Sequence, residues 1–256
     1  MAASRGAKIG IVLVVLAVIL VGVLFVADRV AASTARDRIT DETRKQLAAN
    51  SVTYEAGPSV KIAGFPFLTQ VLAGKYEKIT IALTRPQIED VKLESLTVDA
   101  KSVKADARDL MNGTGEVVAG EVAGRATMTW DNVRKLLVFT NLPQGVDPSA
   151  VDVKVVNNKI ELRIPFQYQG FKITIIANGN MVVEAGKVRL KLDSVTTDQG
   201  SLPKFVNDLI QANKSRLQVT VTLPGLPYNL VINSAETTES GLLVIASAKN
   251  VLLTGQ

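Results

Sequence analysis

The hydrophobic pattern begins with an apolar run that contains no charged residue, from Ile9 to Ala27. A helix needs about 20 apolar residues to cross a bilayer. The apolar core of a secretory signal is shorter, usually about 7–15 residues. The run therefore predicts a retained membrane-spanning helix over residues 9–27, with cleavage near the small residue Ala31 as the alternative.

Charged residues on both sides of the run predict its orientation and the character of the next segment. Arg5 and Lys8 precede it, so the positive-inside rule places residues 1–8 in the cytoplasm and the remainder of the chain outside it. Residues 28–50 are charged and rich in helix formers. They predict a helical stalk that continues the spanning helix, and an extracytoplasmic domain over residues 51–256.

After the stalk, apolar and polar residues alternate with a period of two. This alternation is typical of strands in antiparallel sheets, with one face buried and the other wet. Such segments lie at residues 60–62, 79–83, 151–155, 160–164, 188–192 and 217–223. Asn-Asn and Asn-Gly pairs predict tight turns between strands, at Asn157-Asn158, Asn178-Gly179 and Asn112-Gly113.

Three short helices are expected among the strands, at residues 66–73, 131–137 and 203–213. Pro66 suits the first turn of the first helix and Gly74 suits its end. Asp131 is a candidate cap for the second helix. The pattern as a whole predicts an α+β fold that is dominated by antiparallel strands.

Composition narrows the possible chemistry. The chain has no Cys and no His, which excludes a Ser-His-Asp triad, a Cys nucleophile, and a zinc or haem site with His or Cys ligands. We expect no metal and no cofactor. The net charge of +5 is modest and dispersed, which suits an anionic lipid surface better than nucleic acid.

A motif near the first predicted helix carries a resemblance. Residues 60–76 read VKIAGFPFLTQVLAGKY, and this segment resembles the signature of the LmeA-like phospholipid-binding family of actinobacteria. The matching residues are Gly64, Phe65, Pro66, Phe67, Leu68, Thr69, Gln70 and Gly74. The stretch LPGLPY at Leu223–Tyr228 and the late Asn250-Val251 resemble the family's C-terminal part.

The resemblance covers roughly residues 46–253. It implies an extracytoplasmic lipid binder in cell-envelope biogenesis, and the apolar run predicts its attachment to the cytoplasmic membrane. It also implies a strongly curved antiparallel sheet wrapped around a helix, similar to tubular lipid-binding domains. No set of catalytic residues comes with the family, and a non-enzyme is expected.

The residues themselves suggest how an anionic phospholipid would bind. A curved sheet rich in Val, Ile and Leu suits acyl chains, although an ordinary core has the same composition. The candidate apolar contacts are Phe65, Phe67, Leu68, Val71, Leu72, Trp130, Leu226 and Tyr228. Lys75, Lys78 and Arg85 could hold a phosphate headgroup, as could Lys204, Lys214 and Arg216; a solvated face is the alternative for both sets.

Two other functions stay open. One is an envelope scaffold that binds a protein partner through an open sheet edge. The other is a hydrolase of envelope glycans that uses a pair of carboxylates, for which the candidates are Glu89, Asp90, Glu94, Glu116 and Glu121.

Overall fold

The structure is a computed structural model. It describes residues 5–106, 115–140, 146–156, 159–168, 171–198, 218–221 and 229–253, together with residues 200, 204, 207, 208, 223 and 226. Within the N-terminal helix, side chains are described from Leu16 onward.

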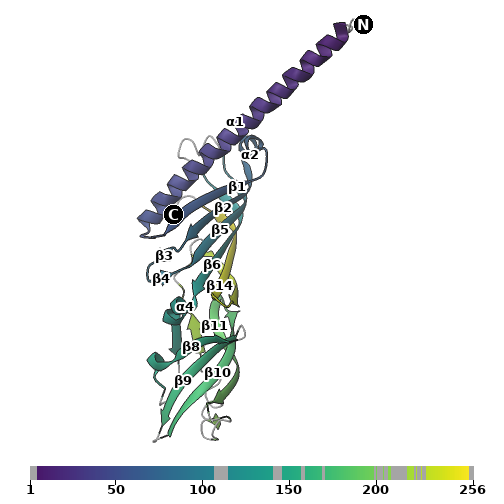
Figure 1. Cartoon of the computed structure of the whole chain (residues 1–256). Coiled ribbons are helices and arrows are strands. Elements are labelled where there is room, and N and C mark those ends of the chain that lie inside the picture. The colour runs from purple at the N-terminus through teal and green to yellow at the C-terminus, as the bar shows by residue number, and fades with distance from the viewer. Residues whose placement is uncertain are drawn as a thin grey trace.

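A single helix, α1 (Arg5–Ala49), contains both the apolar run and the predicted stalk. At 1.5 Å per residue, α1 is about 68 Å long. Figure 1 shows its N-terminal part projecting away from the rest of the molecule, whereas its C-terminal part lies beside strand β1 (Ala56–Ala63). By length and composition, α1 is apolar enough to cross a membrane.

The strands nearest α1 form a six-stranded antiparallel sheet, the proximal sheet. Its order is β1-β2-β5-β6-β14-β13, so the last two strands of the described chain complete a sheet that the first strands begin. The bounds are β2 (Lys75–Thr84), β5 (Ser95–Lys104), β6 (Val118–Thr129), β13 (Val231–Thr237) and β14 (Gly241–Leu252). A small hairpin of β3 (Gln87–Ile88) and β4 (Val91–Lys92) adjoins it.

A second six-stranded antiparallel sheet, the distal sheet, lies at the end of the molecule away from the free part of α1 (Figure 1). Its order is β7-β12-β11-β10-β9-β8. The bounds are β7 (Leu137–Thr140), β8 (Asp152–Val156), β9 (Lys159–Tyr168), β10 (Phe171–Glu184), β11 (Lys187–Thr197) and β12 (Gln218–Val221). The 3₁₀ turn η1 (Pro148–Ala150) precedes β8. The α+β class with a strongly curled antiparallel sheet and an apolar N-terminal helix is confirmed, with the strands divided into two sheets.

Side chains from both sheets contribute to the apolar interior. A larger core takes buried side chains from β6, β13 and β14 of the proximal sheet and from the strands of the distal sheet, among them Met128, Leu162 and Val188. A smaller core lies at the α1 end of the proximal sheet and includes Phe67. Leu230 packs against both cores, so aliphatic side chains connect the α1 end of the molecule to the distal sheet.

The period-two alternation breaks where four strands pass the smaller core. Ser102 in β5 and Asn250 in β14 have positive φ angles of 51° and 53°, and Gly120 lies between their strands in β6. A residue in this conformation interrupts the regular alternation of side chains, so the next side chain points to the opposite face from the one that regular pleating gives. In β5 and β14, residues three apart therefore share the smaller core: Ala100 and Val103, Ala248 and Val251. The same spacing occurs in β2 at Tyr76 and Ile79 and in β6 at Ala119 and Val122, where the strand pairing skips a residue.

One predicted turn is wrong. Asn178-Gly179 lies inside β10, at a register shift against β11. A Cβ on Gly179 would lie 2.3 Å from the carbonyl oxygen of Lys191, so Gly serves a close strand approach here. Val156 in β8 pairs with Lys159 in β9, which leaves two residues for the predicted hairpin connection. Those two residues and Asn112-Gly113 lie outside the described residues.

The short helices differ from prediction at their starts. Helix α2 (Phe67–Ala73) has Pro66 at its N-cap and ends as predicted at Gly74, whose φ is 60°. Helix α4 (Trp130–Leu136) begins one residue earlier than predicted, with Thr129 and not Asp131 at the N-cap. Asp131 pairs instead with Arg134. Of residues 203–213 only 204, 207 and 208 are described, and Lys214 and Arg216 lie outside the described residues.

Candidate functional site

The signature segment, residues 64–75, forms the end of the proximal sheet that lies against α1. Its helix α2 packs by one face: the Phe67 ring is buried 6.1 Å from the Tyr76 ring, and Val71 adjoins the same core. Helical spacing puts Leu68 and Leu72 on a second face. Leu72 is 89% exposed and Phe65 is 59% exposed, so the predicted apolar contacts divide into a buried set and an open set.

Gln70 explains why the signature needs Gly64. The Gln70 side-chain amide donates to the carbonyl oxygen of Ala63 (3.1 Å) and accepts from the backbone N–H of Glu77 (2.9 Å). It thus ties α2 to the end of β1 and the start of β2. Gly64 has φ of 93°, and a Cβ there would lie 2.6 Å from the Gln70 amide nitrogen. The glycine leaves room for this bridge.

Helix α1 holds the signature segment at the point where its apolar run ends. Asp28, which is 3% exposed, accepts a hydrogen bond from the Leu68 N–H at the start of α2 (2.8 Å). The Phe25 and Phe65 rings lie 5.9 Å apart. The Arg29 guanidinium lies 5.2 Å and 5.0 Å from these two ring centres, a cation–π arrangement. The sequence marks Asp28 as the first charge after the run, but gives no sign of these contacts.

A pocket of about 370 Å³ adjoins the signature segment. Its described lining comes from residues 64–66, 69–70, 75–77 and 102–104. The volume lies within the range of small-molecule sites, about 300–1,000 Å³. Tyr76 and Val103 line the pocket and also belong to the smaller core, so the pocket lies beside the strands that close this end of the core.

Two lysines face each other across this pocket's edge. Lys75 in β2 pairs directly with Lys104 in β5, and both line the pocket with Glu77 as the carboxylate among the described lining residues. Within the described part of the chain, neither ammonium group has a hydrogen-bond or ion-pair partner. Like charges directly opposite in a sheet are destabilising, and a bound anion would remove that repulsion. Nothing local in the sequence marks Lys104, because strand register brings it to Lys75.

Tyr76 follows Lys75 in β2, and its ring packs in the smaller core. Burial, and after it the nearby Asp106 carboxylate, raises the pKa of the Tyr76 phenol above its ordinary value. The phenol is therefore neutral at physiological pH and keeps its O–H. The two ammonium groups of Lys75 and Lys104 can donate to the oxygens of a phosphate.

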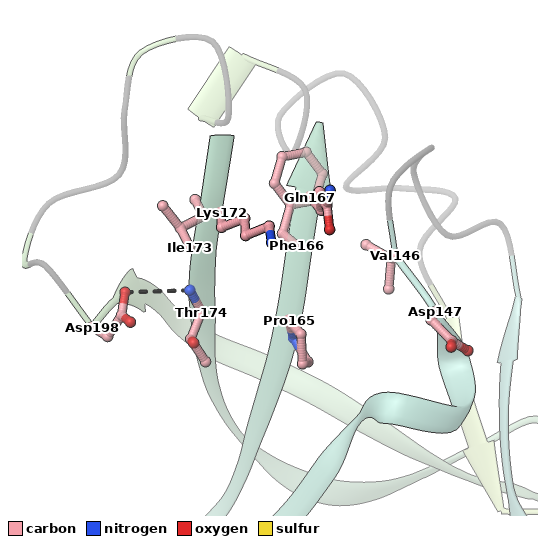
Figure 2. Close-up of a pocket in the computed structure, with 9 residues that line it drawn as sticks. All are labelled: Val146, Asp147, Pro165, Phe166, Gln167, Lys172, Ile173, Thr174 and Asp198. Carbon is pink, nitrogen blue, oxygen red and sulfur yellow. Dashed lines mark hydrogen bonds between the residues drawn. The ribbon is translucent and has the colours of Figure 1, made fainter. Parts of the chain in front are cut away.

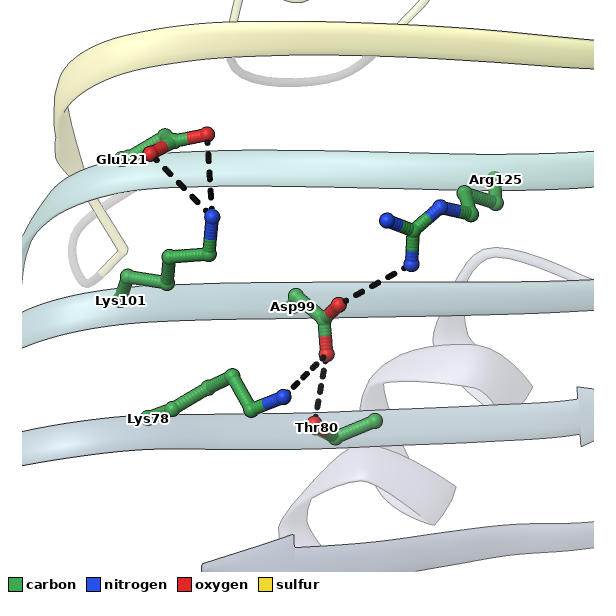
Figure 3. Close-up of polar contacts among 6 residues, drawn as sticks. All are labelled: Lys78, Thr80, Asp99, Lys101, Glu121 and Arg125. Atoms are coloured by element: carbon green, nitrogen blue, oxygen red, sulfur yellow. Dashed lines mark hydrogen bonds and ion pairs between the residues drawn. The ribbon is translucent and has the colours of Figure 1, made fainter. Parts of the chain in front are cut away.

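Lys78 belongs to a different arrangement, on the outer face of the proximal sheet (Figure 3). Asp99, whose side chain is only 10% exposed, accepts from the Thr80 hydroxyl (2.6 Å) and pairs with Lys78 (3.9 Å) and Arg125 (3.4 Å). Lys101 pairs with Glu121 at 3.5 Å. These cations are already compensated by carboxylates.

The other predicted site residues lie elsewhere. Arg85 follows β2 at the end opposite Lys75, where it pairs with Glu55 and with Glu94 (3.2 Å). The indole N–H of Trp130 donates to the Thr238 carbonyl (3.1 Å), and the ring packs on the larger core. Leu226 packs on the same core. Tyr228 lies outside the described residues.

A second cavity, of about 590 Å³, lies at the far end of the distal sheet (Figure 2). Phe166 and Ile173 contribute apolar surface and Lys172 a cation. Asp147 and Asp198 contribute carboxylates, and Asp198 accepts from the Thr174 N–H (3.2 Å). The Ser149 hydroxyl, and after it the Ser149 N–H, donates to Asp147 and lowers the pKa of that carboxyl below its ordinary value. Among the described lining residues carboxylates outnumber cations, which suits an anionic headgroup poorly.

Two of the five carboxylates proposed for a hydrolase form ion pairs with basic side chains in the described residues. Glu94 pairs with Arg85 and Glu121 with Lys101. The side chain of Gln87 donates to the backbone carbonyl of Glu89. In the described ranges no ion pair or hydrogen bond joins two of the five candidates to each other.

Three features are typical of a lipid-binding protein beside a membrane. They are an apolar helix long enough to span a bilayer, curled sheets with an aliphatic interior, and a pocket whose two lysines have no ion-pair partner in the described part of the chain. The chain belongs to the LmeA-like phospholipid-binding family, whose model matches residues 26–247. The family's description is consistent with a non-catalytic role. Comparison with curated proteins finds no significant match, and neither does comparison with solved structures.

Proposed function

We propose that this chain is a membrane-anchored phospholipid-binding protein that works outside the cytoplasm and supports cell-envelope biogenesis. Helix α1 crosses the cytoplasmic membrane with residues 1–8 on the cytoplasmic side, as the positive charges before the apolar run favour. The sheets and α2 stand on the opposite side. The family assignment and the apolar helix support this arrangement.

In this proposal the phosphate of an anionic phospholipid binds at Lys75 and Lys104. The observation that carries the proposal is this pair of opposed lysines, which has no carboxylate partner among the described residues and lies beside the signature segment. Charge-assisted hydrogen bonds are roughly twice as strong as neutral ones. A headgroup phosphate therefore gains more binding free energy at Lys75 and Lys104 than at Lys78 and Lys101, because the latter two already pair with carboxylates.

The acyl chains follow the aliphatic interior of the proximal sheet. The smaller core, which includes Tyr76 and Val103, adjoins the pocket, and Leu230 packs against both this core and the larger one. Each methylene taken out of water contributes about 0.8 kcal/mol. Partly buried aliphatic side chains such as Ile79, Val98 and Leu96 supply such surface along the way.

Photo-crosslinking in proteoliposomes tests the proposal with the full chain. The vesicles contain an anionic phospholipid that carries a diazirine in its acyl chain, and mass spectrometry locates the adducts after irradiation. We expect adducts on peptides of β2, β5 and β13, in addition to those on the apolar part of α1. Adducts confined to α1 would contradict lipid binding by the sheets.

The edge of the distal sheet favours a second candidate, a scaffold that binds an envelope protein. Strand β8 is the last strand of the sheet in the described chain, and Val156 in it is 44% exposed. An open edge can pair with a strand from a partner. Replacing Val156 by Pro would abolish recovery of a co-purifying envelope protein and leave lipid adducts unchanged; lipid adducts lost with the partner would argue against a separate role for this edge.

A further inference from the structure

The open apolar side chains of the signature segment lie together at one end of the molecule. Leu72 is 89% exposed and Phe65 is 59% exposed. Single exposed apolar residues are common on soluble proteins. Phe65 and Leu72 differ because they belong to one short segment, which packs directly on a helix of spanning length. We call these two side chains the rim.

The contacts with α1 fix the level of the rim relative to the bilayer. The uncharged run over residues 9–27 is about 28 Å long as a helix, close to the hydrocarbon thickness of a bilayer, about 30 Å. Phe25 lies in the last turn of that run, and its ring contacts the Phe65 ring at 5.9 Å. Asp28 and Arg29, the first charges after the run, contact Leu68 and Phe65. The rim therefore stands at the boundary between hydrocarbon and headgroups.

The chemistry around the rim matches that boundary. Aromatic rings are enriched at the membrane interface, and long basic side chains extend from apolar surroundings toward phosphates. Arg29 lies against two aromatic rings, and Lys75 follows α2 directly. A protein partner or a second copy would need its own match to this mixed surface, whereas the bilayer that holds α1 is already in place.

We propose that Phe65 and Leu72 insert into the outer leaflet of the same bilayer that α1 crosses. The pocket between α2, β2 and β5 then opens at the headgroup layer, and a phospholipid enters it sideways from that leaflet without passing through water. This inference rests on the proposed function and adds the source of the lipid and its route of entry.

Spin labelling tests the position of the rim, since the chain has no Cys and single-Cys variants label at one site. Leu72→Cys and, as the matched control, Val156→Cys in the distal sheet are labelled with a nitroxide in the full chain. Each variant is reconstituted in nanodiscs that contain phosphatidylglycerol. The relative accessibility of each label to oxygen and to a water-soluble nickel chelate gives its depth.

We expect the label at position 72 to lie about 5–10 Å below the phosphate level, as in interfacial amphipathic segments, and the label at position 156 to be in water. A label at position 72 that is as accessible to nickel as the control would overturn the inference. So would spin–spin broadening at position 72, because it would identify a second copy of the chain as the occupant.

The crosslinking experiment separates this inference from the proposed function. Adducts within the sheets together with an aqueous label at position 72 would refute insertion and leave phospholipid binding standing. An immersed label without adducts in the sheets would refute the proposed function and show that the rim only attaches the domain to the bilayer, which also overturns lateral entry.

Discussion

Two lysine pairs face each other across the same two strands, β2 and β5, and they have opposite surroundings. Lys78 pairs across the strands with Lys101, and each has a carboxylate, Asp99 or Glu121, within 4 Å. Lys75 pairs with Lys104, and in the described chain neither has one. The outer-face pair is balanced by carboxylates of the fold itself. The proposal assigns the pocket pair to a ligand because, in the described chain, no such carboxylate balances it.

The largest expected effect comes from removing the pocket pair. In the double variant Lys75→Gln/Lys104→Gln, two charge-assisted contacts of about 1.5–3 kcal/mol each are lost, reduced by solvent screening at this exposed site. We expect the phospholipid concentration for half-maximal adduct formation to rise about 10- to 100-fold. The matched control Lys101→Gln/Arg125→Gln removes the same charge from the outer face and should leave that concentration unchanged. An equal rise in both variants would show that the pocket lysines have no special role in lipid binding.

The next largest effect is on the free energy of unfolding and comes from a substitution on the outer face of the proximal sheet. Asp99→Ala removes the nearly buried acceptor of the Thr80 hydroxyl and the partner of two cations. A hydrogen bond to a charged group contributes about 1.5–3 kcal/mol, so we expect the free energy of unfolding to fall by about 2 kcal/mol. Thermal unfolding in nanodiscs measures it. Lipid adducts should persist below the melting temperature, and their selective loss would contradict a purely structural role.

A smaller, local effect is expected where α1 meets α2. Asp28→Ala removes the acceptor of the Leu68 N–H, and loss of a comparable helix cap costs about 1 kcal/mol. Hydrogen exchange of the Leu68 amide should speed up about fivefold. Asp41→Ala, an exposed site on the same helix paired only with Arg44, is the control. Unchanged exchange at Leu68 would mean that Asp28 does not hold the signature segment.

The smallest effect tests the compensated pair itself. Lys101 and Glu121 are both substantially exposed, at 48% and 42% of the side chain. Exposed ion pairs contribute about 0.2–1 kcal/mol. We expect Lys101→Gln to change the free energy of unfolding by less than about 1 kcal/mol in chemical denaturation. A much larger loss would show that this pair matters more to the proximal sheet than its exposure indicates.

Local patterns were sufficient to predict much of the fold. An uncharged run has few alternatives to a long helix, and alternation marked the strands from Val60 to Leu192. Alternation failed where the backbone itself changes: Ser102 and Asn250 reverse the side-chain faces, and Gly179 permits a close approach that resembles a turn in sequence. The division of the strands into two sheets depends on pairing between distant segments, which no local pattern encodes.

The candidate site was predictable only where it is contiguous. The signature around Phe65 and Phe67 indicated, by resemblance, the end of the molecule where the proposed site lies, and Lys75 came with it. Lys104 and Asp28 were missed because they reach the site through strand register and helix packing, at sequence distances of about 30 and 40 residues. Arg85 shows the converse, since ten residues along a strand move a side chain roughly 30 Å away.

The unbroken course of α1 has a mechanical consequence. In the proposed membrane arrangement, α1 runs as one helix from the lipid to β1, so a tilt of the helix in the bilayer tilts the sheets by the same angle. Helices lean more in thin bilayers and less in thick ones. The thickness of the surrounding membrane would thus steer the direction in which the far end of the molecule points.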